Sequence, residues 1–105
     1  MRKIVFFALF AGIMLIGASA MAHTPLFSCY DNGDKTVTCE GGFSDGSSAS
    51  GVKIFVYDGS GNVLQETKLN EFSEVTFKKP EGDYSVRFDA GEGHKLDVPG
   101  AEIVE

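Results

Sequence analysis

The sequence lacks the parts that common enzymes need. It has only two histidines, and it has no glycine pattern typical of a nucleophile elbow, a phosphate-binding loop or a dinucleotide-binding fingerprint. Few side chains could therefore act as a general base for the many serines. Most of the 15 acidic residues fit solvated strand faces and turns. We predict a binding protein and not an enzyme.

The sequence also lacks an apolar run long enough for a comfortable membrane span, which needs about 20 residues. Its longest run, residues 4–16, follows Arg2 and Lys3 and precedes small residues, as in a secretory signal peptide. No cysteine lies near the cleavage region, which argues against a lipoprotein anchor. We expect residues 1–22 to be a helical signal peptide and residues 23–105 to be one periplasmic domain, not inserted in a membrane after cleavage. An uncleaved anchor is the alternative.

Basic charge is scarce. The formal net charge of the whole chain is −6, and removing residues 1–22 removes Arg2 and Lys3 but no acidic residue, which gives −8. An acidic surface repels nucleic acid and anionic lipid, and it is compatible with collecting cations. We therefore expect no nucleic-acid partner.

Cysteine is limited to Cys29 and Cys39, which flank a predicted hairpin with an Asn-Gly turn. Thiols of exported proteins are usually oxidised, so we predict a disulfide between the two. In the chain-entropy model a bridge across this short loop contributes about 3 kcal/mol to stability. The alternative is that two thiolates bind a soft metal together with His23.

Helical periodicity is absent after the signal region. Short segments alternate with a two-residue period instead, and glycine and polar clusters separate them. This pattern predicts an all-β fold, an antiparallel immunoglobulin-like or transthyretin-like β-sandwich of about seven short strands. The expected strands are residues 26–31, 36–40, 52–57, 63–69, 74–78, 83–90 and 94–98, with residues 101–104 as a further edge strand.

Two glycine-rich segments are predicted to be connections. Residues 41–51 have the composition of a loop, and Phe43 is their one aromatic residue, so we expect it to hold the loop against the body of the domain. Residues 58–62 carry acidic and polar side chains at the spacing that opens a calcium loop. However, Val63 replaces the required glycine and Leu69 the required glutamate, so we predict an ordinary hairpin turn.

The signal junction offers two cleavage sites with different chemistry. Cleavage after Ala22 would make His23 the first residue, whose amine and imidazole together chelate a transition metal. A nitrogen of His94 would then complete a T-shaped, three-nitrogen set, which suits Cu(II) or Ni(II). The metal could also recruit the Thr24 amide but could not continue past Pro25, which has no N–H. Candidate oxygen ligands are Asp89, Glu92 and Asp97, of which Glu92 is nearest to His94 in sequence.

Cleavage after Ala20 would place His23 third in the mature chain. An amine, two deprotonated amides and an imidazole would then bind Cu(II) or Ni(II) in a plane, with no need for His94. A third interpretation gives neither histidine a role: His23 happens to follow the signal, and His94 is a surface loop residue.

The chain resembles a family of small periplasmic proteins linked to nickel and cobalt uptake. The resemblance covers the post-signal His23, the hairpin of residues 52–69 and the closing segment of residues 80–94, which ends in Gly-x-Gly-His. The Pro-x-Gly-x-Tyr pattern within that segment is also similar to carboxypeptidase-regulatory-like sandwich modules. The two histidines are similar to those of periplasmic copper-resistance carriers, but this chain lacks their Asp-x-His pair near its end and has few methionines. The resemblance therefore favours nickel or cobalt over copper.

The resemblance implies a protein that captures Ni(II) or Co(II), with Cu(II) as a further candidate, and delivers the ion to an inner-membrane transporter. The expected metal site comprises His23, His94, Glu92 and Asp89. Because both imidazoles must be neutral to bind metal, affinity should fall below about pH 6. The alternatives are an interaction module that binds a protein through its sheet edges, and a copper-dependent oxidative enzyme, for which the chain has no evident substrate platform.

Overall fold

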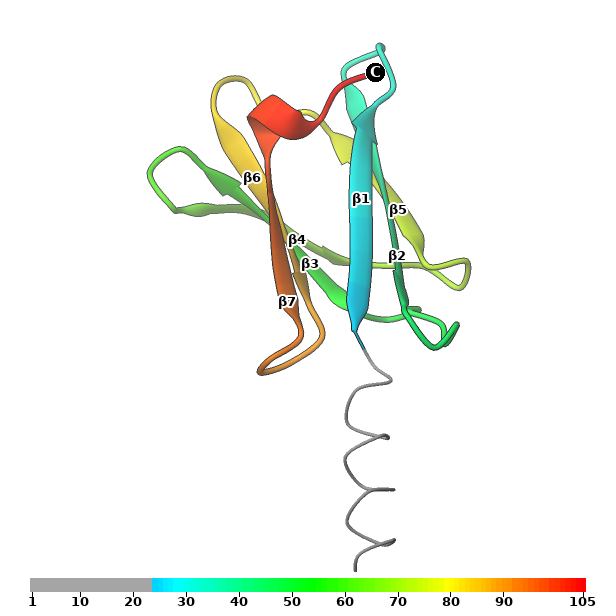
Figure 1. Ribbon diagram of the computed structural model, residues 1–105. Coiled ribbons are helices and arrows are strands. Elements are labelled where there is room, and N and C mark those ends of the chain that lie inside the picture. The colour runs from blue at the N-terminus through cyan, green and yellow to red at the C-terminus, as the bar shows by residue number, and fades with distance from the viewer. Residues whose placement is uncertain (1–23) are drawn as a thin grey trace, which may run out of the picture.

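The computed structural model describes residues 24–105 (Figure 1). Its strands form two antiparallel sheets, with orders β1-β2-β5 and β4-β3-β6-β7. The predicted all-β sandwich is confirmed, whereas the predicted helical signal peptide and His23 lie outside the described residues. No helix within residues 24–105 is long and apolar enough to cross a membrane. The elements are β1 (Pro25–Asp31), β2 (Thr36–Phe43), β3 (Lys53–Asp58), β4 (Val63–Lys68), β5 (Glu74–Lys78), β6 (Tyr84–Asp89), β7 (Lys95–Pro99) and the 3-10 helix η1 (Gly100–Glu102).

The hydrophobic core lies between the two sheets and is built by the two-residue alternation of the strands. Along β6, Tyr84, Val86 and Phe88 are buried while the residues between them are partly exposed. On the neighbouring β3, Ile54 and Val56 are fully buried. Successive side chains of a strand point to opposite faces, so one face of each strand enters the core.

Aromatic rings join the sheets at one end of the core. The ring of Phe88 lies 5.2 Å from that of Phe27 and 5.9 Å from that of Phe43. Phe88 belongs to the second sheet, whereas Phe27 and Phe43 lie on β1 and β2 of the first. The prediction that Phe43 holds its segment against the body of the domain is confirmed.

β2 is longer than predicted because two glycines belong to the strand and not to the loop. Gly41 and Gly42 pair with Phe27 and Leu26 across the ladder. A Cβ at Gly41 would meet side-chain atoms of Leu69 and Phe88 at 2.7–2.8 Å. The glycine is therefore needed for close packing, a use that its composition-based assignment to a loop did not reveal.

The expected edge strand over residues 101–104 is wrong. The chain turns through η1 instead, and a Cβ at Gly100 would lie 2.7 Å from the ring of Tyr84. This close approach lets Ile103 bury its side chain, which is 4% exposed. The tail then joins β1, since the Asp31 amide donates a hydrogen bond to the Val104 carbonyl over 3.0 Å. Apolar packing, and not a sheet ladder, fixes the tail.

The β3–β4 connection is the predicted hairpin turn. The Oδ1 atom of Asp58 accepts hydrogen bonds from the amides of Ser60 and Asn62, each over 2.9 Å. These bonds, together with one from the Asn62 side chain, lower the pKa of the Asp58 carboxyl. The carboxylate therefore closes the turn.

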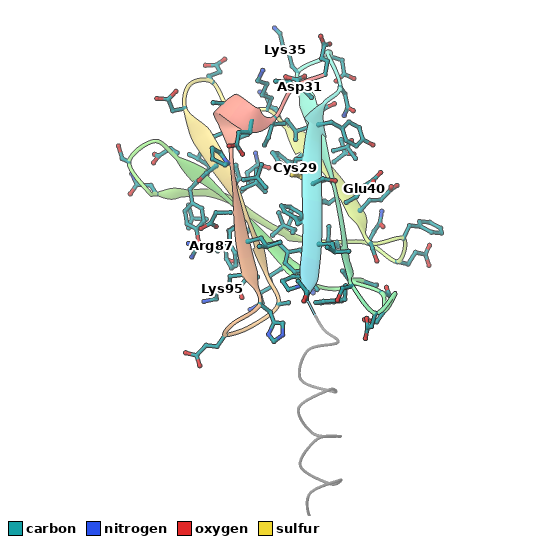
Figure 2. All side chains as sticks on the ribbon, viewed as in Figure 1. Cys29, Asp31, Lys35, Glu40, Arg87 and Lys95 are labelled. Atoms are coloured by element: carbon teal, nitrogen blue, oxygen red, sulfur yellow. A yellow bond between two sulfur atoms is a disulfide. The ribbon has the colours of Figure 1, made fainter. Side chains whose placement is uncertain are left out.

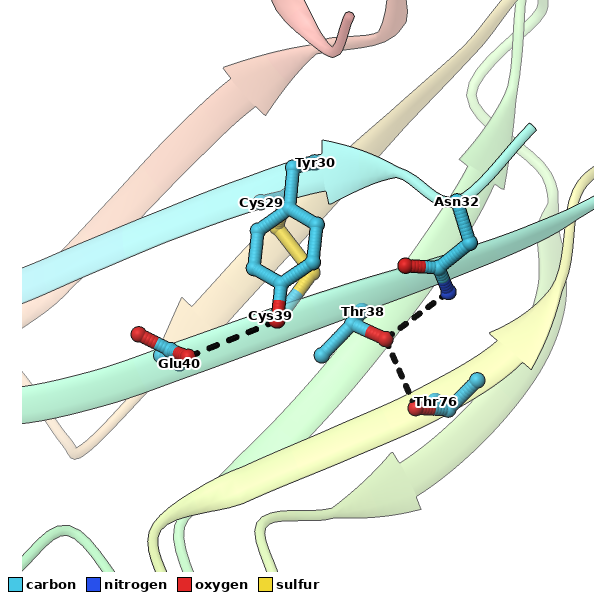
Figure 3. The surroundings of a disulfide bond; sticks show 7 residues. All are labelled: Cys29, Tyr30, Asn32, Thr38, Cys39, Glu40 and Thr76. Atoms are coloured by element: carbon cyan, nitrogen blue, oxygen red, sulfur yellow. Dashed lines mark hydrogen bonds between the residues drawn. A yellow bond between two sulfur atoms is a disulfide. The ribbon is translucent and has the colours of Figure 1, made fainter. Parts of the chain in front are cut away.

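The predicted disulfide between Cys29 and Cys39 is confirmed (Figure 3). The two residues face each other across β1 and β2, with 4.0 Å between their Cα atoms. Such a bond indicates an oxidising, exported environment. It also engages both sulfurs, so the alternative of two thiolate ligands is wrong for this oxidised chain. On the outer face beside it, the Thr38 hydroxyl lies within hydrogen-bond distance of Asn32 and Thr76.

Candidate functional site

The start of β1 and the start of β7 lie at the same end of the sandwich (Figure 1). The two strands belong to different sheets, contact each other and run in the same direction. We call this region the histidine end and define it as residues 24–26, 43–52 and 90–95. The fold therefore brings His94, which immediately precedes β7, to the end where the described chain begins.

His94 is held in the turn between β6 and β7. The amide of Ala90 donates to the His94 carbonyl over 3.0 Å, and the amide of His94 donates to the Gly91 carbonyl over 2.9 Å. The Nδ1 atom of the half-buried ring lies 3.1 Å from the Glu92 carbonyl oxygen. In the neutral tautomer that donates from Nδ1, the lone pair is on Nε2. A backbone carbonyl on one ring nitrogen is the usual way in which a metal-binding histidine is oriented.

The candidate carboxylates differ in their relation to His94. Glu92 shares the turn, and its carbonyl contacts the imidazole. Ala90, the cross-strand partner of His94, packs on the core. Its neighbour Asp89 therefore lies on the opposite, outer face of the second sheet. The Asp89 carboxylate accepts the Gly91 amide over 3.0 Å and lies 3.9 Å from Lys95 Nζ. The structure thus brings Glu92 to His94 but does not bring Asp89 there.

Asp97, the remaining carboxylate near His94 in sequence, is engaged by Arg87. The guanidinium donates two hydrogen bonds, of 2.7 Å from Nε and 3.0 Å from Nη2, to the two carboxylate oxygens. These bonds lower the pKa of the Asp97 carboxyl. Arg87 also lies over the Tyr57 ring, 5.4 Å from its centroid. Figure 2 shows Arg87 and Lys95 on the side of the second sheet that faces away from the first. Arg87, Asp97 and Tyr57 thus contact one another on the outer surface of the second sheet.

The start of the described chain is fastened to Ser44, the residue that follows β2, by a pair of hydrogen bonds that sequence reasoning missed. The Thr24 amide donates to Ser44 Oγ over 3.1 Å, and the Ser44 amide donates to the Thr24 carbonyl over 2.8 Å. A metal that recruited the Thr24 amide would have to break the first of these bonds. The signal for this contact is the β1–β2 register, which a single sequence does not give.

A hollow of about 540 Å³ lies at the histidine end. It connects the end of β2 to the turn that carries His94, because Phe43 lines one part of it and Ala90 and Gly91 line another. Its remaining lining residues are Ser50, Gly51, Val52, Lys53 and Asp89. The hollow shows that the two connections approach each other at this end.

The donor atoms available to a metal are nitrogen and oxygen. The last methionine of the sequence is Met21, and both cysteines form the disulfide. Within residues 24–105, no three histidine, cysteine, aspartate or glutamate side chains gather as a metal site. His23, the other histidine of the sequence, lies outside the described residues. An amine, imidazoles and carboxylates fit Ni(II), Co(II) or Cu(II), whereas Cu(I) prefers sulfur.

The chain matches no family model, no curated protein and no solved structure. The resemblance to proteins of nickel and cobalt uptake therefore stays a prediction from the sequence.

Proposed function

We propose that this chain is a periplasmic protein that binds Ni(II) or Co(II), with Cu(II) as a weaker candidate, and delivers the ion to an inner-membrane transporter. After cleavage following Ala22, the amine and imidazole of His23 chelate the ion, and Nε2 of His94 is the third nitrogen. The protein binds and carries, and it catalyses no reaction.

The observation that carries this proposal is the position of His94. It lies at the end of the sandwich where the chain enters β1, and its Nδ1 faces the Glu92 carbonyl. This arrangement leaves Nε2 as the ligating atom of the neutral ring. The absence of sulfur donors in residues 24–105 other than the disulfide supports divalent ions over Cu(I).

Isothermal titration with Ni(II) and Co(II) tests the proposal. The protein is produced with its own leader and purified after export, and its intact mass establishes the first residue. We expect one ion per chain, with affinity that falls below about pH 6 as the imidazoles become protonated. His94→Ala should weaken binding by at least about 10–100-fold, the effect that loss of even a supporting partner causes at metal sites.

The uncleaved chain provides a second arm of the same experiment. In that chain the backbone nitrogen of His23 is part of a peptide bond. The uncleaved chain should therefore bind Ni(II) and Co(II) as weakly as the processed His94→Ala variant, or more weakly. Indifference of the processed protein to His94→Ala would rule out the two-histidine site. If that protein begins at Met21, the same indifference would support the planar chelate with His23 in third place.

An interaction module is the second candidate, favoured by the exposed side chains of the edge strand β1. Leu26 is 53% exposed and Tyr30 is 41% exposed, and β1 is a seven-residue strand at the edge of its sheet. An extended peptide could add to this edge. This candidate predicts no metal-dependent rise of the melting temperature, whereas a tight metal site raises it by mass action.

A further inference from the structure

We propose that Asn32 is a site of spontaneous deamidation and that the fold slows this reaction by hydrogen-bonding both of its reacting groups. Asn32 and Gly33 form the one Asn-Gly pair of the sequence. The pair is exposed and lies in the turn between β1 and β2. The proposal is independent of metal binding, because it concerns a covalent modification that needs no reactant besides water.

Deamidation at an Asn-Gly pair begins at the glycine amide. The Gly33 nitrogen loses its proton and attacks Asn32 Cγ, and the bond from Cγ to Nδ2 breaks, so that Nδ2 leaves with that proton as ammonia. Water then opens the resulting succinimide ring at either carbonyl carbon, which gives aspartate or isoaspartate. Glycine favours the attack because it has no Cβ to crowd its nitrogen. The reaction therefore needs a free Gly33 amide and an Asn32 side chain that can turn toward it.

Two threonines hold the side chain of Asn32. Its Nδ2 atom donates to Thr36 Oγ1 and to Thr38 Oγ1, each over 2.9 Å. Thr38 Oγ1 in turn lies 2.8 Å from Thr76 Oγ1 on the neighbouring strand (Figure 3). A side-chain amide has two N–H donors, and both are used here. The amide must break these bonds before its carbon can turn toward Gly33.

The attacking nitrogen is engaged as well. The Gly33 amide donates to Asp31 Oδ1 over 2.8 Å. A carboxylate at this distance disfavours loss of the amide proton, because a nearby negative charge opposes the formation of another. Asp31 stays ionised, since the hydrogen bond from Lys79 lowers the pKa of its carboxyl. The nucleophile is therefore held in its unreactive, protonated form.

Modification of this turn would disturb a junction of three segments. The Asp31 amide bonds the Val104 carbonyl of the tail, and the Asp31 carboxylate bonds Lys79 at the end of β5. The Lys79 amide also donates to the Lys35 carbonyl over 2.8 Å. Isoaspartate carries the main chain through its side-chain carbons and lengthens it, so contacts on both sides of Asn32 would shift. The hydrogen bonds of Asn32 and Gly33 thus preserve the place where β1, β5 and the tail meet.

Mass spectrometry of the exported, processed protein tests the proposal. After incubation at mildly alkaline pH, reduction and digestion with trypsin, the peptide that ends at Lys35 contains Asn32 as its one side-chain amide. Its gain in mass, as the amide becomes an acid, gives the rate. We expect the same chain unfolded in guanidinium chloride to react at least about tenfold faster than the native protein, because the bonds that restrain Asn32 and Gly33 are then lost.

The double variant Thr36→Val and Thr38→Val removes both acceptors of Asn32 while keeping the β-branched shape. Its folded form should deamidate about 10–100-fold faster than the wild type, since each lost hydrogen bond corresponds to a factor of roughly three to ten. Thr76→Val is the matched control: it makes the same change on the same face, next to Thr38 but without a bond to Asn32. It should stay within about threefold of the wild type.

Circular dichroism and melting temperatures establish that each variant is folded. If the double variant does not fold, Thr38→Val alone, compared with Thr38→Ser, which keeps the acceptor, tests one bond in the same way. A native wild type that reacts as fast as the unfolded chain would overturn the proposal. Folded variants without their acceptors that keep the wild-type rate would overturn it too, since the hydroxyls would then not restrain the amide.

Discussion

The two ends of the sandwich are built in different ways. We call the end opposite to the histidine end the lysine end and define it as residues 31–36, 79–84 and 100–105. There the chain closes on itself: Lys79 Nζ lies 2.7 Å from Asp31 Oδ2, and the tail is joined to β1. Figure 2 shows Asp31 and Lys35 beside the C-terminal segment. At the histidine end, in contrast, hydrogen bonds fasten Thr24 to Ser44 and orient the imidazole of His94.

This difference suggests different roles for the two ends. An ion pair at the surface contributes little to stability, about 0–1 kcal/mol, but its two charges are already engaged within the chain. A backbone that is fixed around an imidazole can present that ring to an ion without first being ordered. The lysine end therefore holds the tail against β1, and in the proposed function the histidine end binds the ion.

The largest effect should come from removing the ring that supports the histidine end. Phe88→Ala deletes a fully buried side chain that contacts Phe27 and Phe43. We expect a loss of about 3–5 kcal/mol in the free energy of unfolding, measured by denaturant titration. Phe72→Ala, at a site that is 74% exposed in the β4–β5 turn, should change it by less than about 0.5 kcal/mol. Equal effects of the two variants would refute this account of the core.

The next largest effect should come from the disulfide, which lies between the two ends. Replacing both Cys29 and Cys39 by alanine should cost about 3 kcal/mol of unfolding free energy. Ni(II) affinity of the folded variant should stay within about threefold of the wild type, because neither sulfur is a ligand in our account. A large loss of affinity would bring the thiol-based alternative back.

The smallest effect should appear at the lysine end on acidification. The hydrogen bond from Lys79, followed by that from the Gly33 amide, lowers the pKa of the Asp31 carboxyl. A carboxyl with a lowered pKa stabilises the fold above its ordinary value of about 3.9, and this contribution is lost as the pH falls through the folded value. The melting temperatures of wild type and Asp31→Asn should therefore converge below about pH 4.

Asp83→Asn provides the comparison for that experiment, since Asp83 is an exposed residue at the same end. Its melting curve should follow the wild type throughout the acid range. A constant gap between wild type and Asp31→Asn from pH 6 to the acid limit would show that the ion pair does not carry the pH dependence.

The sequence predicted the features that depend on local pattern. The alternation in residues 52–57 and 83–90 identified two central strands, and the exported context of Cys29 and Cys39 identified their disulfide. The tail was mispredicted because Ile103 and Val104 have strand-forming side chains, whereas the contact of Gly100 with Tyr84 decides the path of the chain.

At the candidate site, too, the sequence indicated residues that are rare or near each other in sequence, but not contacts that depend on strand pairing. His94 stood out because histidine is rare, and Glu92 stood out because it is near in sequence. Ser44 gave no such signal, since only the pairing of β1 with β2 relates it to Thr24. Register over twenty residues depends on turn geometry and core packing together, which sequence spacing alone does not specify.

Paramagnetic NMR of the exported, processed protein with Co(II) tests the central claim most directly. The account predicts that amide signals of Thr24, Ser44 and residues 92–94 shift or broaden most, while those of Gly33, Lys35 and Glu105 at the lysine end change least. Strongest effects at the lysine end, or no localised effect at all, would contradict a metal site at the histidine end.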